Sequence, residues 1–243
     1  MTTTIRRVEC RSRRYEVAVE GQEPVLLPSV TSVLSTVIAK PGLMHWARNT
    51  ALQSVREVLL DNRPVMALDE ESIDALIAEA KARPDQVRDE AADYGTTAHA
   101  LIDAILGDEE PVIPPAYSET IAAFYAWEAE ASLAIEKRER MVYSLEHGYA
   151  GTLDAIGWNS DRGHAVLDWK TSNGLYPETA LQVTAYAMAY EEMTGEKVTE
   201  AWVVRLGKKQ PEFEAKRVDL DACKPTWLDA LNLWKGLKSV WMP

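Results

Sequence analysis

The sequence contains little cysteine, with only Cys10 and Cys223 among 243 residues. Two cysteines so far apart indicate reduced thiols rather than a disulfide framework, and they are too few for a four-cysteine iron–sulfur cluster. No run of about 18 apolar residues occurs, so we expect no transmembrane helix. The N-terminal residues lack an apolar signal core, which predicts a cytoplasmic protein. The chain also lacks a Gly-x-x-x-x-Gly-Lys-Ser/Thr loop, so we expect no bound nucleotide and no motor activity.

Positive charge is also scarce. The net charge of −12 argues against a general nucleic-acid binder. Residues 61–110 alone hold 14 acidic and 4 basic residues, and the rest of the chain is close to neutral. Each of two basic clusters is either a solvated face or a binding surface: Arg6, Arg7, Arg11, Arg13 and Arg14 form one, and Arg205, Lys208, Lys209, Lys216 and Arg217 form the other. We therefore expect DNA binding outside an active groove to be weak and salt-sensitive.

Apolar residues make up 47% of the chain, which is enough for a core in one large domain or in one domain with a helical addition. Hydrophobic spacing predicts both strands and helices. Strands are expected within residues 5–20, 141–145, 150–158, 164–171, 201–206 and 213–220. Helices are expected over residues 30–38, 43–60, 72–82, 85–106, 117–138, 176–193 and 221–241. Ser29 is a predicted N-cap, Pro84 a predicted break and Gly195 a predicted helix stop.

Two β-favouring segments, residues 150–158 and 164–171, flank the turn residues Asn159-Ser-Asp-Arg-Gly163. If these five residues form the loop, the register of the hairpin is fixed. The expected pairs are Trp158–His164, Ile156–Val166 and Asp154–Asp168. Opposed side chains in a sheet have Cβ atoms about 5 Å apart, so the two carboxylates would repel each other.

Lys170 lies on the same face as Asp168, because side chains alternate along a strand. The hairpin therefore presents two acids and one amine together. A divalent cation between the acids would remove their repulsion, and hard cations such as Mg²⁺ prefer oxygen ligands. The alternative is an ordinary hairpin in which Lys170 forms a salt bridge on an exposed face.

These residues resemble the PD-(D/E)XK nuclease superfamily. Gly-Thr-Leu-Asp154 followed by Leu-Asp168-Trp-Lys170-Thr matches its two acids and its lysine. Gly95-Thr-Thr-Ala-His99 upstream and Gln182-Val-Thr-Ala-Tyr186 downstream narrow the resemblance to the RecB-type exonuclease branch. The four blocks lie within residues 90–205, and residues 25–50 are similar to the leader of phage-encoded members. The low cysteine count separates the chain from the CRISPR-associated iron–sulfur members.

The resemblance implies an α/β fold with a restriction-endonuclease-like mixed central sheet flanked by helices, and a helical N-terminal addition. We expect residues 1–110 to form a strand pair and a helical region that contributes His99. Residues 111–243 are expected to form the nuclease core with a C-terminal helix, and the two parts to make one compact unit.

The resemblance also implies the site. Asp154, Asp168 and Lys170 would be catalytic. One or two Mg²⁺ or Mn²⁺ ions would bind to His99, Asp154, Asp168 and the carbonyl group of Trp169. Gln182, Tyr186 and Thr171 would contact the substrate, with Glu146 and Gly95 as accessory residues. Two positions depart from the family pattern: Asp168 stands where many relatives carry Glu, and Leu153 precedes Asp154 in place of the motif's Pro.

The activity implied is metal-dependent hydrolysis of DNA from a free end, in phage or bacterial recombination, repair or DNA processing. A recombinase or single-strand annealing protein is an expected kind of partner, and an oligomer is compatible with the sequence. Three alternatives stay open. They are a structure-specific endonuclease of the same fold, a DNA-binding module without turnover, and a recruitment protein whose acidic helical region binds partners.

Overall fold

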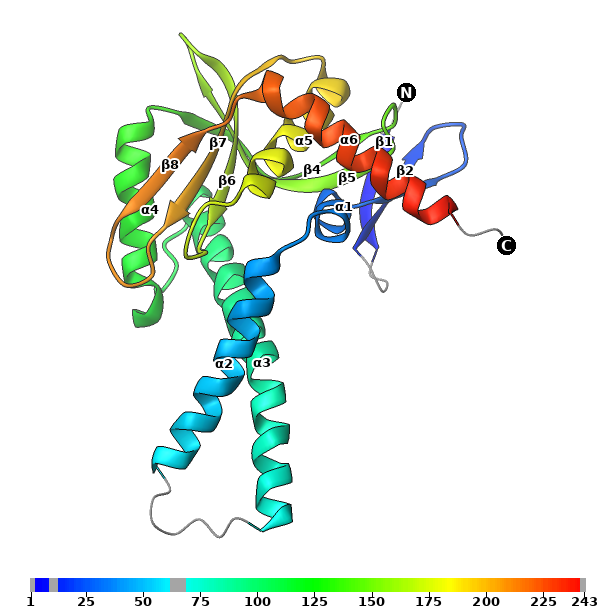
Figure 1. The fold of residues 1–243 in the computed structure, drawn as a ribbon. Coiled ribbons are helices and arrows are strands. Elements are labelled where there is room, and N and C mark those ends of the chain that lie inside the picture. Colours follow the sequence, from blue (N-terminus) through cyan, green and yellow to red (C-terminus); the bar gives the residue numbers. More distant parts are fainter. Residues whose placement is uncertain (1–2, 9–12, 62–68, 241–243) are drawn as a thin grey trace. The chain divides into compact units, whose positions relative to one another are not determined.

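The computed structural model describes residues 3–8, 13–61 and 69–240 (Figure 1). Contacts group the chain into two compact units, residues 1–38 with 98–243 and residues 39–97. The boundary expected at residue 110 stays a prediction. Cys10 and Arg11 lie outside the described residues, and Cys223 has a free thiol. Within the described part of the chain, no helix has the length and apolar character needed to cross a membrane.

A five-stranded mixed sheet forms the centre of the larger unit (Figure 1). All neighbouring strands are antiparallel except β6 and β7, which are parallel and are connected through helix α5 (Pro177–Thr194). The α/β class, with a mixed sheet flanked by helices, is therefore confirmed. The strands in sheet order are β4 (Ala134–Ser144), β5 (Tyr149–Asn159), β6 (Gly163–Lys170), β7 (Val198–Leu206) and β8 (Phe213–Arg217).

Each face of this sheet carries its own apolar core. Ile156, Val166 and Val203 pack with α5 in one cluster. Ala155, Leu167 and Trp169 pack in the other, against α4 (Ser118–Ala131) and the end of α3 (Glu70–Leu106). Because side chains alternate along a strand, Asp168 and Lys170 lie on the α5 face of β6, as Val166 does. In β5 the alternation is interrupted, since Leu153 and Ile156 both pack in the α5 cluster. The face on which Asp154 lies therefore does not follow from alternation alone.

A three-stranded sheet precedes the central one and consists of β1 (Thr3–Val8), β2 (Arg14–Val19) and β3 (Val25–Pro28). It confirms the predicted strand pair within residues 5–20. Tyr15 of β2 is buried and its hydroxyl lies 2.9 Å from Oγ1 of Thr152 in β5. Helix α1 (Val30–Val37) follows β3, and the hydroxyl of Ser29 accepts a hydrogen bond from Ser32 N–H, as predicted for an N-cap.

Helix α6 (Leu220–Ser239) packs against α1 and α5, with Trp227 and Leu231 in the core. Asp219 caps it by accepting a hydrogen bond from Ala222 N–H. At the C-terminal end of α5, Gly195 has a φ of 73° and donates its N–H to Glu191 O, which confirms the predicted helix stop.

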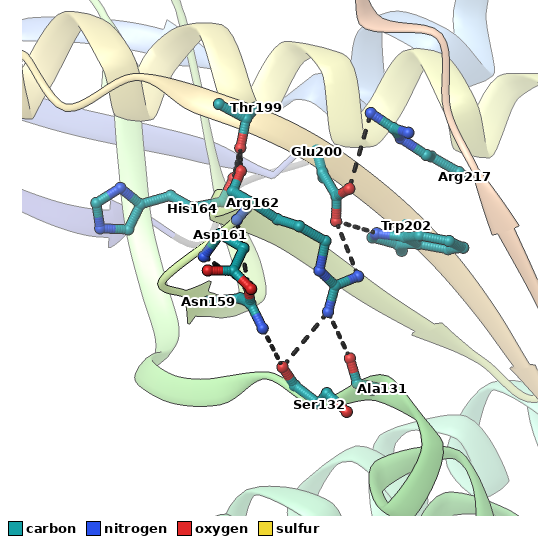
Figure 2. A network of polar contacts seen from close by, with 10 residues as sticks. All are labelled: Ala131, Ser132, Asn159, Asp161, Arg162, His164, Thr199, Glu200, Trp202 and Arg217. Carbon is teal, nitrogen blue, oxygen red and sulfur yellow. Dashed lines mark hydrogen bonds and ion pairs between the residues drawn. The ribbon is translucent and has the colours of Figure 1, made fainter.

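An ionic network ties the end of α4 to the sheet at the beginning of β7 (Figure 2). Arg162, in the turn between β5 and β6, donates to the carbonyl groups of Ala131 and Ser132 at 2.7 and 3.4 Å. Its other terminal nitrogen donates to the buried carboxylate of Glu200 at 3.4 Å. The indole N–H of Trp202 donates to the same carboxylate oxygen at 3.1 Å, and Arg217 lies 3.7 Å from the second oxygen.

The smaller unit contains α2 (Pro41–Asp61) and the part of α3 that precedes residue 98. The α3 helix is continuous through Pro84, so the break predicted there is wrong. Proline removes one backbone hydrogen bond. The Ala, Glu, Lys and Arg residues on both sides favour helix strongly enough to continue it.

The helix predicted over residues 117–138 is also wrong in its second part. Helix α4 ends at Ala131, Ser132 adopts a left-handed φ of 51°, and β4 begins at Ala134. Residues 134–138 have helical propensity, but they pair with β5 through backbone hydrogen bonds. Tertiary pairing therefore overrides local preference in this segment.

Candidate active site

The β5–β6 hairpin has the register expected from its loop. Trp158 pairs with His164 and Ile156 with Val166, and the ladder continues to Ala155 and Leu167. It ends before Asp154 and Asp168, which are not a hydrogen-bonded pair. Instead, Oδ2 of Asp154 accepts a hydrogen bond from Trp169 N–H at 2.8 Å. The carboxylate thus takes the place of a ladder partner and is held close to β6.

Asp168 is fully buried and touches two polar side chains on the α5 face of the sheet. Gln182, on α5, donates from Nε2 to Oδ1 of Asp168 at 2.9 Å. The ammonium group of Lys170 forms an ion pair with Oδ2. Gln182 also lies 3.2 Å from the hydroxyl of Tyr186 one turn later. The predicted residues of β6 and α5 therefore form one connected polar group.

Tyr186 covers the strand that carries Asp154. Its ring lies so close to Gly151 that a Cβ atom at that position would overlap it. A residue without a side chain is therefore required at position 151, because α5 approaches β5 closely there. Tyr186 is itself buried.

His99, on α3, reaches the same place from the other side of Asp154. Its Nδ1 lies 3.4 Å from Oδ1 of Asp154. Together with Glu139, these residues each offer one ligand atom, and the three atoms lie within 4.8 Å of one another. Among the described residues, this is the group of three His, Cys, Asp or Glu side chains that could hold a metal ion.

Glu139 is the site residue that sequence reasoning missed. It lies in β4 with a φ of 42°, at a point where β4 and β5 do not form a regular pair. Residues 134–138 were expected to be helical, so no strand was available to carry it. A signal was present: counting back from Ser144 and Tyr149 across their turn puts Glu139 opposite Asp154.

The remaining predicted site residues are Glu146, Thr171 and Gly95. Glu146, the acid named as accessory, is in the β4–β5 turn, where its carboxylate lies 4.0 Å from His147. Its position on that turn makes Glu139 the better candidate for an accessory acid. Thr171 is buried directly after Lys170. Gly95 belongs to the smaller unit, and its accessory role stays a prediction.

Trp169 links the site to the opposite core. Its backbone N–H binds Asp154, as described above, while its indole ring packs edge-on against Phe124 and Trp127 of α4, with centroids 5.8 Å apart in both cases. Metal ligation by its carbonyl group stays a prediction.

The charges of the site determine which groups hold protons. Burial opposes protonation of His99, but the charge of Asp154 and the hydrogen bond to it outweigh burial and raise the pKa of His99 to about 9. Burial would raise the pKa of Asp154, yet His99, Lys170 and the Trp169 N–H together lower it. Without a metal, His99 and Asp154 therefore form a charged pair.

Asp168 is affected in the opposite direction. Burial raises its pKa, the Lys170 ammonium counteracts this, and the nearby charge of Asp154 adds to the rise, so the net pKa is above the usual value. Burial would lower the pKa of Lys170, but Asp168 and Asp154 raise it overall. Lys170 therefore keeps its proton more firmly than a free lysine, while Asp168 meets both this cation and the charge of a second carboxylate.

Comparison with known proteins gives one strong match. Residues 71–233, more than half of the chain, match a family model described as PD-(D/E)XK nuclease superfamily. No curated protein matches the sequence.

Solved structures show only distant likeness. A crystal structure titled SSO0001 has a TM-score of 0.38 at 11% identity and covers 79% of this chain and 86% of its own. An alkaline exonuclease (LHK-Exo) from Laribacter hongkongensis has a TM-score of 0.30 at 13% identity and covers 59% of this chain and 82% of its own. These scores are too low to support an argument, so the assignment depends on the family model.

Proposed function

The chain belongs to the PD-(D/E)XK nuclease superfamily, and from this premise we propose that it is a metal-dependent deoxyribonuclease that degrades DNA from a free end. The observation that carries the proposal is the grouping of His99, Glu139 and Asp154 beside the Asp168–Lys170 ion pair. The RecB-type branch expected from the sequence is consistent with this family.

The residues fit a divalent cation. An imidazole nitrogen and two carboxylate oxygens converge within 4.8 Å. The buried carboxylate of Asp168 lies close enough to Asp154 for the charge of Asp154 to raise its pKa, and a cation between them would reduce this repulsion. Oxygen ligands suit Mg²⁺, and the imidazole favours Mn²⁺. A cation bound there would lower the pKa of a water molecule and offset negative charge on the scissile phosphate.

The chain's own groups position this chemistry. Trp169 N–H and Gln182 Nε2 hold the two carboxylates in fixed orientations, each through one hydrogen bond. Lys170 keeps its proton and offers an ammonium group for the phosphate oxygens, where charge increases during hydrolysis. Gln182 and Tyr186 lie beside Asp168, where a substrate strand would pass.

The test is cleavage of labelled DNA by the purified protein with Mg²⁺ or Mn²⁺. The substrates are single- and double-stranded oligonucleotides labelled at the 5′ or the 3′ end, and a closed circle. We expect linear DNA to be degraded and the circle to survive. Cleavage of the circle would instead support a structure-specific endonuclease of the same fold.

Two variants decide whether this site is responsible. Asp154→Asn and Lys170→Ala should abolish cleavage. Asp161→Asn is the matched control, because Asp161 lies in the loop of the same hairpin and outside the site. Equal activity of wild type, Asp154→Asn and Lys170→Ala would reject the proposal. DNA binding without turnover by the wild type would favour a binding module.

The proposal extends to context as the sequence suggested it. A cytoplasmic enzyme of phage or bacterial DNA recombination, repair or processing could act with a recombinase or a single-strand annealing protein, as a monomer or an oligomer. Co-purification from cells with tagged protein, with and without nuclease treatment, tests for such a partner.

A further inference from the structure

Strand β7 brings a second cation next to Lys170. Arg205 is the register partner of Lys170 in the parallel β6–β7 ladder. Neighbouring strands lie about 4.8 Å apart, so the two residues leave the backbone side by side. Arg205 belongs to the second basic cluster, which the nuclease chemistry described above does not use.

Arg205 lies on the same face of the sheet as the site. In β7, Ala201 and Val203 pack with α5, whereas Val204 and Leu206 pack in the cluster with α4. The alternation therefore directs Arg205 toward the α5 face, where Asp168 and Lys170 lie.

The two cations have partners of different kinds. Lys170 is paired with Asp168, which is 0% exposed. Arg205 donates from Nε to Oε2 of Glu214 at 3.2 Å, and the Glu214 side chain is 40% exposed. Glu214 also divides its charge with Lys216, 3.0 Å away. Ion pairs this exposed contribute little stability, so Arg205 can exchange its partner at small cost.

The contact with Glu214 uses only Nε of Arg205. Within the part of the chain that the structure describes, Nη1 and Nη2 form no hydrogen bond. A planar guanidinium group with such N–H groups matches a phosphate, to which it can donate two parallel hydrogen bonds. The Arg205 side chain is 20% exposed, so its position is restricted but open to a ligand.

We propose that Arg205 binds a backbone phosphate of the DNA strand next to the scissile one, and that Glu214 competes with this phosphate for Arg205. The inference rests on the proposed nuclease function, since it names a binding contact for that substrate. It also gives the acidic chain a local means of holding DNA where cleavage occurs, while Glu214 limits binding of unrelated polyanions.

Two substitutions that break the same ion pair separate this role from a structural one. Arg205→Gln removes the phosphate ligand, whereas Glu214→Gln removes its competitor and frees Arg205 and Lys216. Arg217→Gln is the matched control. Arg217 lies in β8, the strand next to that of Arg205, and its guanidinium group also faces a glutamate, Glu200 (Figure 2). It is the register partner of Trp202, near the opposite end of the β7–β8 ladder.

Binding is measured by fluorescence anisotropy with labelled single- and double-stranded oligonucleotides, in an Asp154→Asn background that prevents cleavage, over about 50 to 200 mM salt. Arg205→Gln should weaken binding about tenfold and reduce the salt slope by about 0.7 to 0.9, the value for one phosphate. Glu214→Gln should tighten binding about threefold. Arg217→Gln should change neither quantity by more than about twofold.

Steady-state kinetics in the active protein give a second readout. Arg205→Gln should raise KM for DNA more than it lowers kcat, because the contact holds substrate away from the reacting atoms. Unchanged affinity and salt slope in Arg205→Gln would overturn the inference. So would equal weakening by Arg205→Gln and Glu214→Gln, which is the result expected of a purely structural pair.

The outcomes distinguish this inference from the proposed function. Cleavage by wild type together with normal DNA binding by Arg205→Gln rejects only the role of Arg205. Lack of cleavage by wild type rejects the nuclease proposal, while the binding series still measures the contact. Absence of any DNA binding by the Asp154→Asn protein overturns the contact as well.

Discussion

Strands β6 and β7 carry two buried acids with opposite surroundings. Glu200, near the beginning of β7, is 5% exposed and meets two guanidinium groups and an indole N–H (Figure 2). Asp168, near the end of β6, is fully buried and meets one ammonium group, one amide and the charge of Asp154. Glu200 thus meets two cations, whereas Asp168 meets one cation and the charge of a second carboxylate. Two cations around one acid stabilise the local structure, whereas two acids close together favour binding of a further cation.

The largest expected effect comes from Asp168→Asn, which removes the negative charge of the buried acid near the end of β6. We expect the cleavage rate to fall about 10³-fold. The Asp168 carboxylate lies beside the cation-binding group and is also the partner of Lys170, so the substitution removes both contributions. Initial rates on linear DNA measure the effect. Equivalent loss in Glu200→Gln would remove the functional distinction between the two acids.

Glu139→Gln sharpens the assignment of the ligands. We expect Mn²⁺ affinity to fall about 10²-fold, since one of three converging groups loses its charge. Isothermal calorimetry measures the affinity. Glu146→Gln should leave it unchanged, because Glu146 lies in the β4–β5 turn. The reverse order of effects would restore the assignment made from the sequence.

Glu200→Gln should act on stability rather than on activity. Two arginines lose their charged partner, and we expect the free energy of unfolding to fall by about 2 kcal/mol. Urea denaturation measures the change, and DNA cleavage at a temperature where the variant is folded should stay within about twofold of wild type. A variant as stable as wild type would show that the network does not fasten α4.

The pH dependence of metal binding tests the charged His99–Asp154 pair through a gradual change in affinity. His99 has a pKa of about 9 without metal, so a cation must displace its proton. Affinity for Mn²⁺ should rise about tenfold per pH unit between about pH 7 and 9. Calorimetry over this range measures it, and His99→Gln should remove the slope. An affinity independent of pH in wild type would contradict the charged His99–Asp154 pair.

The same group affects the stability of the metal-free protein. The pKa of His99 is raised above its ordinary value of 6.5, so its stabilising contribution is fully present below about pH 6.5 and is lost as the pH rises through 9. Thermal unfolding with a chelator present should show a decline in Tm across that interval, and the decline should be absent in His99→Gln.

Much of this arrangement could be predicted from the sequence. The turn residues from Asn159 to Gly163 set the hairpin register, and alternation put Asp168 and Lys170 on one face of β6. These inferences succeeded because they depend on local geometry. Alternation does not place Asp154, because Leu153 and Ile156 of β5 both pack in the cluster with α5. His99 was assigned through resemblance to a family, since helical spacing alone does not show which strand a helix approaches.

The remainder depended on contacts between distant segments. Pro84 does not break α3, and residues 134–138 join β5 instead of extending α4. That second error concealed Glu139. The end of the ladder before Asp154 also could not be read from alternation, because it arises when the carboxylate accepts Trp169 N–H.

Trp169 connects the two sides of the sheet through a single residue. Its backbone N–H orients the Asp154 carboxylate, and its ring packs edge-on against Phe124 and Trp127 of α4. Phe124 and Trp127 therefore influence the orientation of the Asp154 carboxylate through Trp169, without contacting Asp154 themselves. A substitution that shifts this ring would therefore change the orientation of Asp154 while the fold is still intact.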